Sequence, residues 1–208
     1  MVFRCLAFIC AGVTSLSVSL PLERAMASLR TEPAPHTGGN ATKKDVSGTY
    51  AALPRLLGTL VQLRTGECVP LDEETPTQGR FDSLLADRVT GEAVPIDPHL
   101  LALLRRLSAR HGLAGAPRIE IVSGYRSPKL NEVLRKKGRR VASHSQHSRG
   151  QAVDFRLVPA GASRGLDPRP LEQELRALGW DGGIGVYPTN ADWFVHADVG
   201  PRRRWTGT

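Results

Sequence analysis

A histidine and an aspartate that could share a ligand lie seven positions apart, at His147 and Asp154. Asp154 stands between Val153 and Phe155, in an alternation of apolar and polar residues that is typical of a half-buried strand. Its carboxylate then faces away from the apolar neighbours and needs a partner, for which a cation is the simplest choice. Gly150 permits the backbone to fold back, so that His147 can approach the same point.

A second strand-like stretch, residues 193–199, contributes another histidine. His196 and Asp198 share one face of this predicted strand, and the apolar residues between them share the other. Two histidines and one aspartate are the ligand count of a catalytic zinc site, where water takes the fourth position, whereas structural sites normally close with four protein ligands. We therefore predict a metal site of His147, Asp154 and His196. The alternative is that the histidines are ordinary polar residues of a cleft.

The same residues belong to a longer pattern with two parts, Ser145-x-His147-x-x-Gly150-x-Ala152-x-Asp154 and Phe194-Val195-His196-x-Asp198. This pattern resembles the zinc D-Ala-D-Ala peptidases, which belong to a group with lysostaphin-type enzymes and hedgehog domains. It is similar in particular to the YcbK-like branch of peptidoglycan endopeptidases. Three further stretches fit that branch, residues 123–127, 182–188 and 200–205, so the resemblance extends from about residue 56 to residue 205.

The resemblance implies an α+β fold of the hedgehog/DD-peptidase type, in which a small antiparallel sheet with flanking helices forms a metal cleft. It implies Zn2+ as the cofactor, held by His147, Asp154 and His196, and metal-assisted hydrolysis of an amide bond. Arg126 matches the family's arginine that lies beside the metal and contacts the substrate. A guanidinium suits that role because its planar donors can hold a carboxylate or a developing oxyanion. The alternative is a surface arginine in an ion pair.

The general base stays open at this point. Some relatives place a glutamate three residues before the last histidine ligand, where this chain has Trp193, and others have a His-x-His pair, where it has His196-x-Asp198. Asp198 is therefore either the base or a carboxylate that orients His196. Asp192 and His144 are weaker candidates for the base.

From the resemblance we expect a zinc-dependent murein endopeptidase that hydrolyses peptide cross-links of peptidoglycan in the bacterial envelope. Two alternatives remain: a D-Ala-D-Ala carboxypeptidase, or a catalytically weak cell-wall-binding module of the same fold. The residues do not distinguish a D,D from an L,D cross-link. A serine hydrolase is disfavoured, because Ser145 beside His147 is not set in a nucleophile elbow.

The composition and the first residues predict the location of the protein. The formal net charge of +8 favours anionic partners, among them cell wall, membrane surface and nucleic acid. An apolar run with a small-x-small site at residues 25–27 predicts a signal peptide or N-terminal anchor over residues 1–27. We therefore expect a periplasmic or envelope protein, with membrane anchoring if the segment is uncleaved and without a nucleic-acid partner. Residues 28–55 read as a flexible linker and residues 56–208 as the catalytic domain.

Turn and capping residues predict the elements around the site. Two of the three cysteines lie in the leader, so we expect Cys68 to be a buried, unpaired strand residue. His99 and His111 are predicted to be surface or capping groups. The predicted elements are a hairpin over residues 60–71, helices starting at Asp97-Pro98, Ser127-Pro128 and Asp167-Pro168, a strand over 119–122, a polar loop over 75–80 and a tight backbone passage over 182–185.

Overall fold

The structure is a computed structural model that describes residues 55–136 and 145–207. These residues all belong to one compact unit, Leu53–Thr208. The predicted signal peptide or anchor, the predicted linker up to residue 54, and His144 lie outside the described residues. None of the described helices combines the length and the apolar character that crossing a membrane requires.

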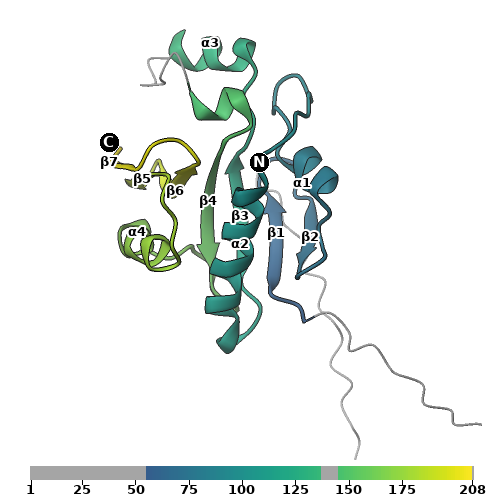
Figure 1. Ribbon diagram of the computed structural model, residues 1–208, viewed down its shortest axis with the longest axis vertical. Coiled ribbons are helices and arrows are strands. Elements are labelled where there is room, and N and C mark those ends of the chain that lie inside the picture. The colour runs from purple at the N-terminus through teal and green to yellow at the C-terminus, as the bar shows by residue number, and fades with distance from the viewer. Residues whose placement is uncertain (1–54, 137–144, 208) are drawn as a thin grey trace, which may run out of the picture. The chain divides into compact units, whose positions relative to one another are not determined.

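Seven strands form one mixed sheet within the described residues, in the order β2-β1-β3-β4-β6-β5-β7 (Figure 1). Their bounds are Gly58–Gln62 for β1, Cys68–Leu71 for β2, Arg118–Ser123 for β3, Ala152–Val158 for β4, Gly183–Pro188 for β5, Trp193–Asp198 for β6 and Arg203–Thr206 for β7. The predicted α+β class is confirmed. The prediction of an antiparallel sheet is wrong at two pairs, because β1 with β3 and β5 with β7 are parallel.

Both parallel pairs follow from how the chain returns to the sheet. β1 and β3 are separated by β2 and by the helices α1 (Gln78–Leu84) and α2 (Pro98–His111), a crossover long enough to bring β3 back in the same direction as β1. β7 follows β6 but passes to the other side of β5, so it runs parallel to β5.

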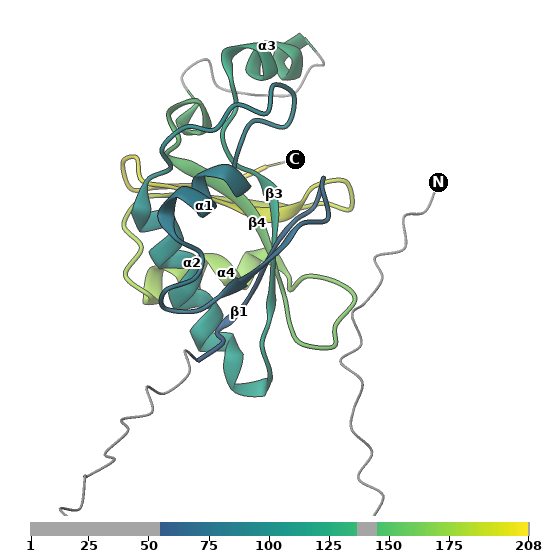
Figure 2. The ribbon, with the colours of Figure 1, turned by 90° about the vertical axis from the view of Figure 1, so that its right-hand side faces the viewer.

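Helices α1, α2 and α4 (Pro168–Ala177) cover one face of the sheet, and Figure 2 shows α2 and α4 on that side. Their apolar residues join those of the strands in one core cluster, to which the helices contribute Phe81, Leu84, Leu100, Leu101, Leu103, Leu104, Leu107, Leu171 and Leu175. The remaining α-helix of the described chain, α3 (Pro128–Lys136), follows β3 and lies beyond one end of the sheet (Figure 1).

Capping residues begin α2 and α4 as predicted. Asp97 accepts a hydrogen bond from the backbone N–H of His99 at 3.0 Å, and Asp167 accepts one from the N–H of Arg169 at 3.0 Å. A proline occupies the first turn after each cap, where its missing N–H is not needed. Helix α2 ends at His111, and Gly112 is its C-terminal cap.

Helix α1 starts inside the stretch that we predicted as a polar loop, residues 75–80. Thr77 caps it by accepting a hydrogen bond from the N–H of Arg80 at 3.3 Å. Phe81 and Leu84 are buried in the core. The loop prediction is therefore wrong in its second half, because a cap and two buried residues favour a helix there.

The predicted hairpin is confirmed, with β1 and β2 antiparallel and Gly66 in the turn at φ 73°. The prediction that Cys68 is buried is wrong, because Cys68 is exposed. Alternation along β2 turns Val69 and Leu71 into the core, which leaves Cys68 facing solvent.

Alternation also sorts the central strands β3, β4 and β6 into two faces. The face toward the helices is apolar and carries Ile119, Ile121, Val153, Phe155, Val195 and Ala197. The opposite face, the polar face, carries Glu120, Asp154, Arg156, His196 and Asp198. The register pairs Glu120 with Arg156 and Asp154 with His196, so the predicted ligands of β4 and β6 lie side by side on the polar face.

Candidate metal centre

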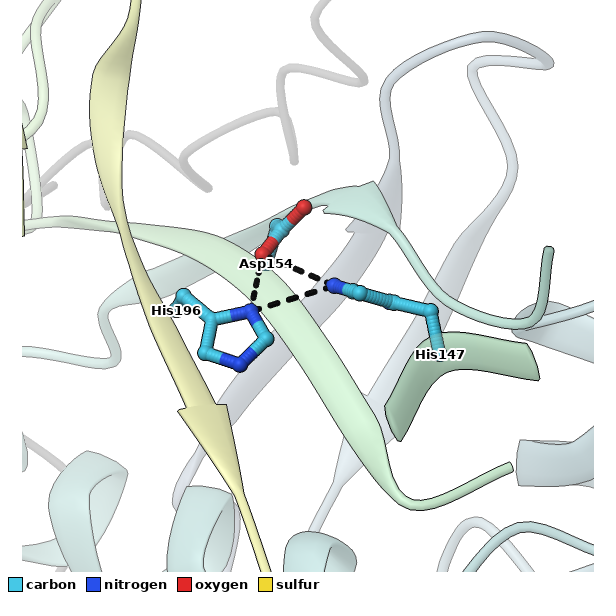
Figure 3. A group of neighbouring side chains, drawn as sticks. All are labelled: His147, Asp154 and His196. Atoms are coloured by element: carbon cyan, nitrogen blue, oxygen red, sulfur yellow. Dashed lines mark hydrogen bonds and ion pairs between the residues drawn. The ribbon is translucent and has the colours of Figure 1, made fainter. Parts of the chain in front are cut away.

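The three predicted ligands meet at one point, although they come from three separate segments (Figure 3). His147 Nε2 lies 3.2 Å from Asp154 Oδ1 and 3.1 Å from His196 Nδ1, and His196 Nδ1 lies 2.8 Å from Asp154 Oδ1. The residues are 1%, 2% and 7% exposed for His147, Asp154 and His196. One ion could therefore contact all three side chains.

A short 3-10 helix, Gln146–Arg149, brings His147 to the strand that carries Asp154. It ends at Gly150, which adopts a left-handed conformation at φ 69°. A side chain there would collide with the carbonyl of Pro95, so both the conformation and the space favour glycine. The predicted reversal at Gly150 is confirmed.

Backbone hydrogen bonding fixes the ring of His147. Its Nδ1 lies 2.7 Å from the carbonyl oxygen of Gly124. Because a carbonyl oxygen only accepts, Nδ1 carries the proton, and Nε2 presents its lone pair to Asp154 and His196. This is the arrangement of a histidine that binds a metal through Nε2.

A second carboxylate fixes the ring of His196. Asp198 is fully buried, and its Oδ2 lies 3.0 Å from His196 Nε2. The same oxygen accepts a hydrogen bond from Arg203 at 2.9 Å, and Oδ1 accepts one from the N–H of Gly200 at 2.8 Å. The Cβ of any other residue at Gly183 would collide with this carboxylate, which explains the predicted tight passage. Nδ1 of His196 is thus left to face Asp154.

Arg126 lies beside the centre, as predicted, but it is already engaged there. Its terminal nitrogen donates to Asp154 Oδ2, and its Nε donates to Ser123 Oγ at 2.9 Å. The side chain is 16% exposed. The ion pair that we held as an alternative is therefore present, although inside the site rather than on the surface.

Burial and neighbouring charges keep His147 and Asp154 in the forms that bind a metal. Burial lowers the pKa of His147 to about 4, and the charge of Arg126 acts in the same direction. Burial works to raise the pKa of Asp154, but the neighbouring charges of His147 and Arg126 outweigh it and hold that pKa well below its ordinary value. At neutral pH the centre therefore presents an ionised carboxylate and a neutral His147.

Asp198 and His196 shift each other in opposite directions. Burial would raise the pKa of Asp198, but the hydrogen bond from His196 and the charge of that ring lower it. Burial would lower the pKa of His196, but its hydrogen bonds to Asp154 and Asp198 outweigh burial and raise it. Asp198 is therefore ionised at neutral pH.

The other candidates lie elsewhere. His99 contacts its own helix cap, Asp97, and His111 contacts Glu174, so neither joins the centre. Asp192 is not part of the one group of His, Cys, Asp and Glu side chains in residues 55–136 and 145–207 that could hold a metal.

Two aromatic residues, neither of them predicted as a site residue, border the centre. The ring of Trp205 lies 5.1 Å from that of His196, centroid to centroid, and its Nε1 donates a hydrogen bond to the hydroxyl of Tyr187 at 3.1 Å. Both residues belong to stretches that carried the family resemblance, 182–188 and 200–205. The motifs therefore contain both residues, but they do not indicate a role for either side chain.

Comparison with known proteins shows the family of the chain. Residues 74–205 match the family model Peptidase_M15_2, described as peptidoglycan L,D-endopeptidase MepK. The chain belongs to this family. M15 peptidases are metalloenzymes, which fits a centre of two histidines and an aspartate. The predicted kinship with peptidoglycan peptidases is thereby confirmed and narrowed to the MepK family.

Two relatives illustrate the similarity. A probable peptidoglycan L,D-endopeptidase MepK of Haemophilus influenzae is 36% identical over 128 residues, covering 62% of this chain and 63% of the relative. Peptidoglycan L,D-endopeptidase MepK of Escherichia coli K12 is 36% identical over 162 residues, covering 73% of this chain and 80% of the relative. The chain thus spans just under two thirds of the Haemophilus protein. No solved structure matches the chain.

Proposed function

We propose that this protein is a zinc-dependent murein endopeptidase that hydrolyses L,D peptide cross-links of peptidoglycan in the bacterial envelope. The observation that carries the proposal is the convergence of His147, Asp154 and His196 at one buried point. Membership of the MepK family supports the substrate, and the names of the relatives favour the L,D over the D,D cross-link. The fold is then of the hedgehog/DD-peptidase type, with the metal in a cleft on the polar face.

Zinc suits the three ligands. His147 would bind through Nε2, His196 through Nδ1 and Asp154 through Oδ1, and three protein ligands are the number typical of catalytic zinc sites. Zinc held in this way supplies Lewis-acid chemistry and a nucleophile derived from water near neutral pH. Gly124 and Asp198 orient the two rings, and His147 and Arg126 keep the pKa of Asp154 low.

Of the two roles left open for Asp198, we propose that it positions His196. A general base must reach the water from which it takes a proton. Asp198 is fully buried, and its two oxygens already accept hydrogen bonds from His196, Gly200 and Arg203. A carboxylate that orients a ligating histidine and raises its basicity is a common feature of zinc sites.

Digestion of purified sacculi tests this function. We expect the protein to release peptides whose mass spectra identify cleaved L,D cross-links, and we expect chelation or His196→Ala to abolish the release. His99→Ala, a histidine substitution at an exposed helix start, should leave activity intact. Equal release after chelation, or by the His196→Ala variant, would contradict the proposal. Release of free D-Ala alone would favour the carboxypeptidase, and retention on sacculi without fragments would favour a wall-binding module.

We also propose that residues 1–27 deliver the protein to the periplasm or anchor it at the membrane. The proposed substrate supports an envelope location, and the positive charge suits the anionic wall. Cell fractionation of the full chain and of a chain lacking these residues tests this. Recovery of both forms in the periplasm would contradict it.

A further inference from the structure

Tyr187 and Trp205 form an aromatic pair that borders the metal centre. Besides its hydrogen bond to Trp205, Tyr187 stacks on Phe194 with 4.4 Å between ring centroids and 17° between the ring planes. Trp205 in turn lies against the ring of His196. The phenol is therefore held on two sides, by stacking and by a hydrogen bond.

The sheet register places this pair on the polar face. Gly185 of β5 pairs with His196 of β6 on one side and with Trp205 of β7 on the other. A Cβ at Gly185 would lie 2.6 Å from the Trp205 ring, so the indole occupies the space that glycine leaves. Tyr187 follows two residues later on the same face, which brings its hydroxyl to the indole nitrogen.

The hydroxyl of Tyr187 has a proton free to donate. An indole N–H only donates, so in the bond with Trp205 the Tyr187 oxygen is the acceptor. No other hydrogen-bond partner of this hydroxyl is found in the described part of the chain. Burial raises the pKa of Tyr187 and outweighs the hydrogen bond from Trp205, which lowers it. The phenol is thus neutral at physiological pH.

We propose that Tyr187 is a catalytic residue whose hydroxyl donates a hydrogen bond to the oxygen of the scissile amide as that oxygen becomes an oxyanion. This inference rests on the proposed function. Arg126, the donor expected from the sequence, already donates to Asp154 and Ser123. Tyr187 offers a donor on the polar face that the centre does not use for itself. Trp205 is a positioning residue, because it acts by holding the Tyr187 oxygen.

The hydrogen bond from Tyr187 to the carbonyl oxygen strengthens as the amide is hydrolysed, because negative charge develops on that oxygen. The oxygen of water bonds to the carbonyl carbon, and the π electron pair of the carbonyl moves onto its oxygen, which takes the hydrogen bond from Tyr187. When the carbonyl re-forms, the carbon–nitrogen bond breaks, and a proton from the water goes to the leaving amine. Tyr187 keeps its own proton throughout, so its contribution is electrostatic.

The decisive variant is Tyr187→Phe, which removes the hydroxyl and keeps the ring that stacks on Phe194. We expect kcat on a purified L,D-linked muropeptide dimer to fall about 100- to 1000-fold, as for the loss of one oxyanion donor, with KM changed less than about threefold. Zinc content and melting temperature should stay at the wild-type values. A phosphinate analogue of the tetrahedral species should lose affinity by the same factor as kcat/KM, while an uncleavable substrate analogue keeps its affinity.

Two further variants serve as comparisons. Trp205→Phe keeps a ring beside His196 but loses the N–H, so we expect a smaller fall in kcat, on the order of tenfold, with zinc retained. Tyr125→Phe removes the hydroxyl of a buried core tyrosine and should leave kcat unchanged.

The outcomes separate this inference from the proposed function. If the wild-type protein does not cleave muropeptides, the proposed function fails and this inference fails with it. If the wild type cleaves and Tyr187→Phe retains kcat within about threefold, the function stands and Tyr187 is not the donor. A fall that appears only in KM, or that comes with lost zinc or a lower melting temperature, would also overturn the catalytic assignment.

Discussion

At the scale of single residues, the hydrogen bond made by the outer ring nitrogen of each histidine decides which nitrogen faces the centre. The carbonyl of Gly124 takes Nδ1 of His147, and the carboxylate of Asp198 takes Nε2 of His196. The two rings therefore present different nitrogens to the same point, Nε2 in one and Nδ1 in the other. A neutral partner and a charged partner do the same orienting work, but only Asp198 adds negative charge behind its histidine.

Replacing Asp198 with asparagine should weaken zinc binding rather than abolish chemistry. Loss of a carboxylate behind a ligating histidine typically lowers metal affinity about 10- to 100-fold. Competition with a chelator measures that affinity in the variant and the wild type. Activity should return when zinc is raised to saturation, because Asp198 is proposed to position His196 and not to move a proton.

The exposed aspartate Asp181 provides a matched substitution, Asp181→Asn, which should leave zinc affinity unchanged. Unaltered zinc affinity in Asp198→Asn together with lost activity at saturating zinc would identify Asp198 as the general base and contradict our assignment.

At the scale of elements, Gly185 in β5 and the carboxylate of Asp87, which follows α1, hold the site in place. Gly185 makes room for Trp205 between β5 and β7. Asp87 accepts hydrogen bonds from the N–H groups of Thr90 at 2.9 Å and Ser127 at 2.5 Å. Since Ser127 follows Arg126, this carboxylate ties the segment after α1 to the segment that carries Arg126.

A methyl group at residue 185 should disturb the aromatic pair. Gly185→Ala forces the Trp205 ring away, and overpacking of this kind lowers the free energy of unfolding by about 1–3 kcal/mol. Activity should fall as well, because the bond from Trp205 to Tyr187 is lost. Gly79→Ala in α1 meets open space and should be neutral or stabilising by up to about 1 kcal/mol. Urea unfolding of both variants checks this, and equal stability of the two would contradict it.

Asp87→Asn should destabilise the protein in a pH-dependent way. Asp87 is 2% exposed, and an amide nitrogen facing N–H donors would cost about 1–3 kcal/mol of unfolding free energy at pH 7. Burial works to raise the pKa of Asp87, but hydrogen bonds from Ser127, Thr90 and Val89 outweigh it and lower that pKa. The stabilisation is therefore present above the ordinary carboxyl pKa of about 4 and is lost as the pH falls through the lower, folded value.

Urea unfolding at pH 7 and in mild acid measures this difference. The gap between wild type and Asp87→Asn should narrow in acid, whereas Glu132→Gln on the surface of α3 should show no gap at either pH. A gap that widens in acid would show that Asp87 is not the stabilising carboxylate.

The elements differ in how far the sequence predicts them. The starts of α2 and α4 were predictable because Asp97 and Asp167 act within one turn of their own helices. The approach of His147 to Asp154 was predictable because strand alternation and Gly150 act locally. The parallel pairs β1–β3 and β5–β7 could not be predicted, because local sequence patterns do not indicate which strands pair after long connections. For the same reason Tyr187 was missed: Trp205 reaches it only because β7 pairs with β5.

At the scale of the whole molecule, the two faces of the sheet differ. The apolar face packs against the helices and stabilises the fold, and the polar face carries the proposed metal centre. In residues 55–136 and 145–207 Cys68 is unpaired, so no disulfide reinforces this part of the chain. Stability there comes from the core beneath α1, α2 and α4. A metal ion bound at the proposed centre on the polar face would add to it.

Zinc should therefore raise the stability of the whole protein. An ion that binds the folded state alone adds about 2.7 kcal/mol when its free concentration is about 100 times Kd. Thermal unfolding with and without zinc should show this gain in the wild type and in His99→Ala, but not in His147→Ala. A gain of the same size in His147→Ala would contradict binding at the proposed centre.

The central claim is that two imidazole nitrogens and one carboxylate oxygen bind the same zinc ion. X-ray absorption at the zinc edge, combined with metal analysis of the purified protein, tests it most directly. We predict about one zinc per chain, bound by two histidine nitrogens and by oxygen, and almost none in His147→Ala, Asp154→Ala or His196→Ala. Full zinc content in all three variants, or sulfur among the ligands, would contradict the claim.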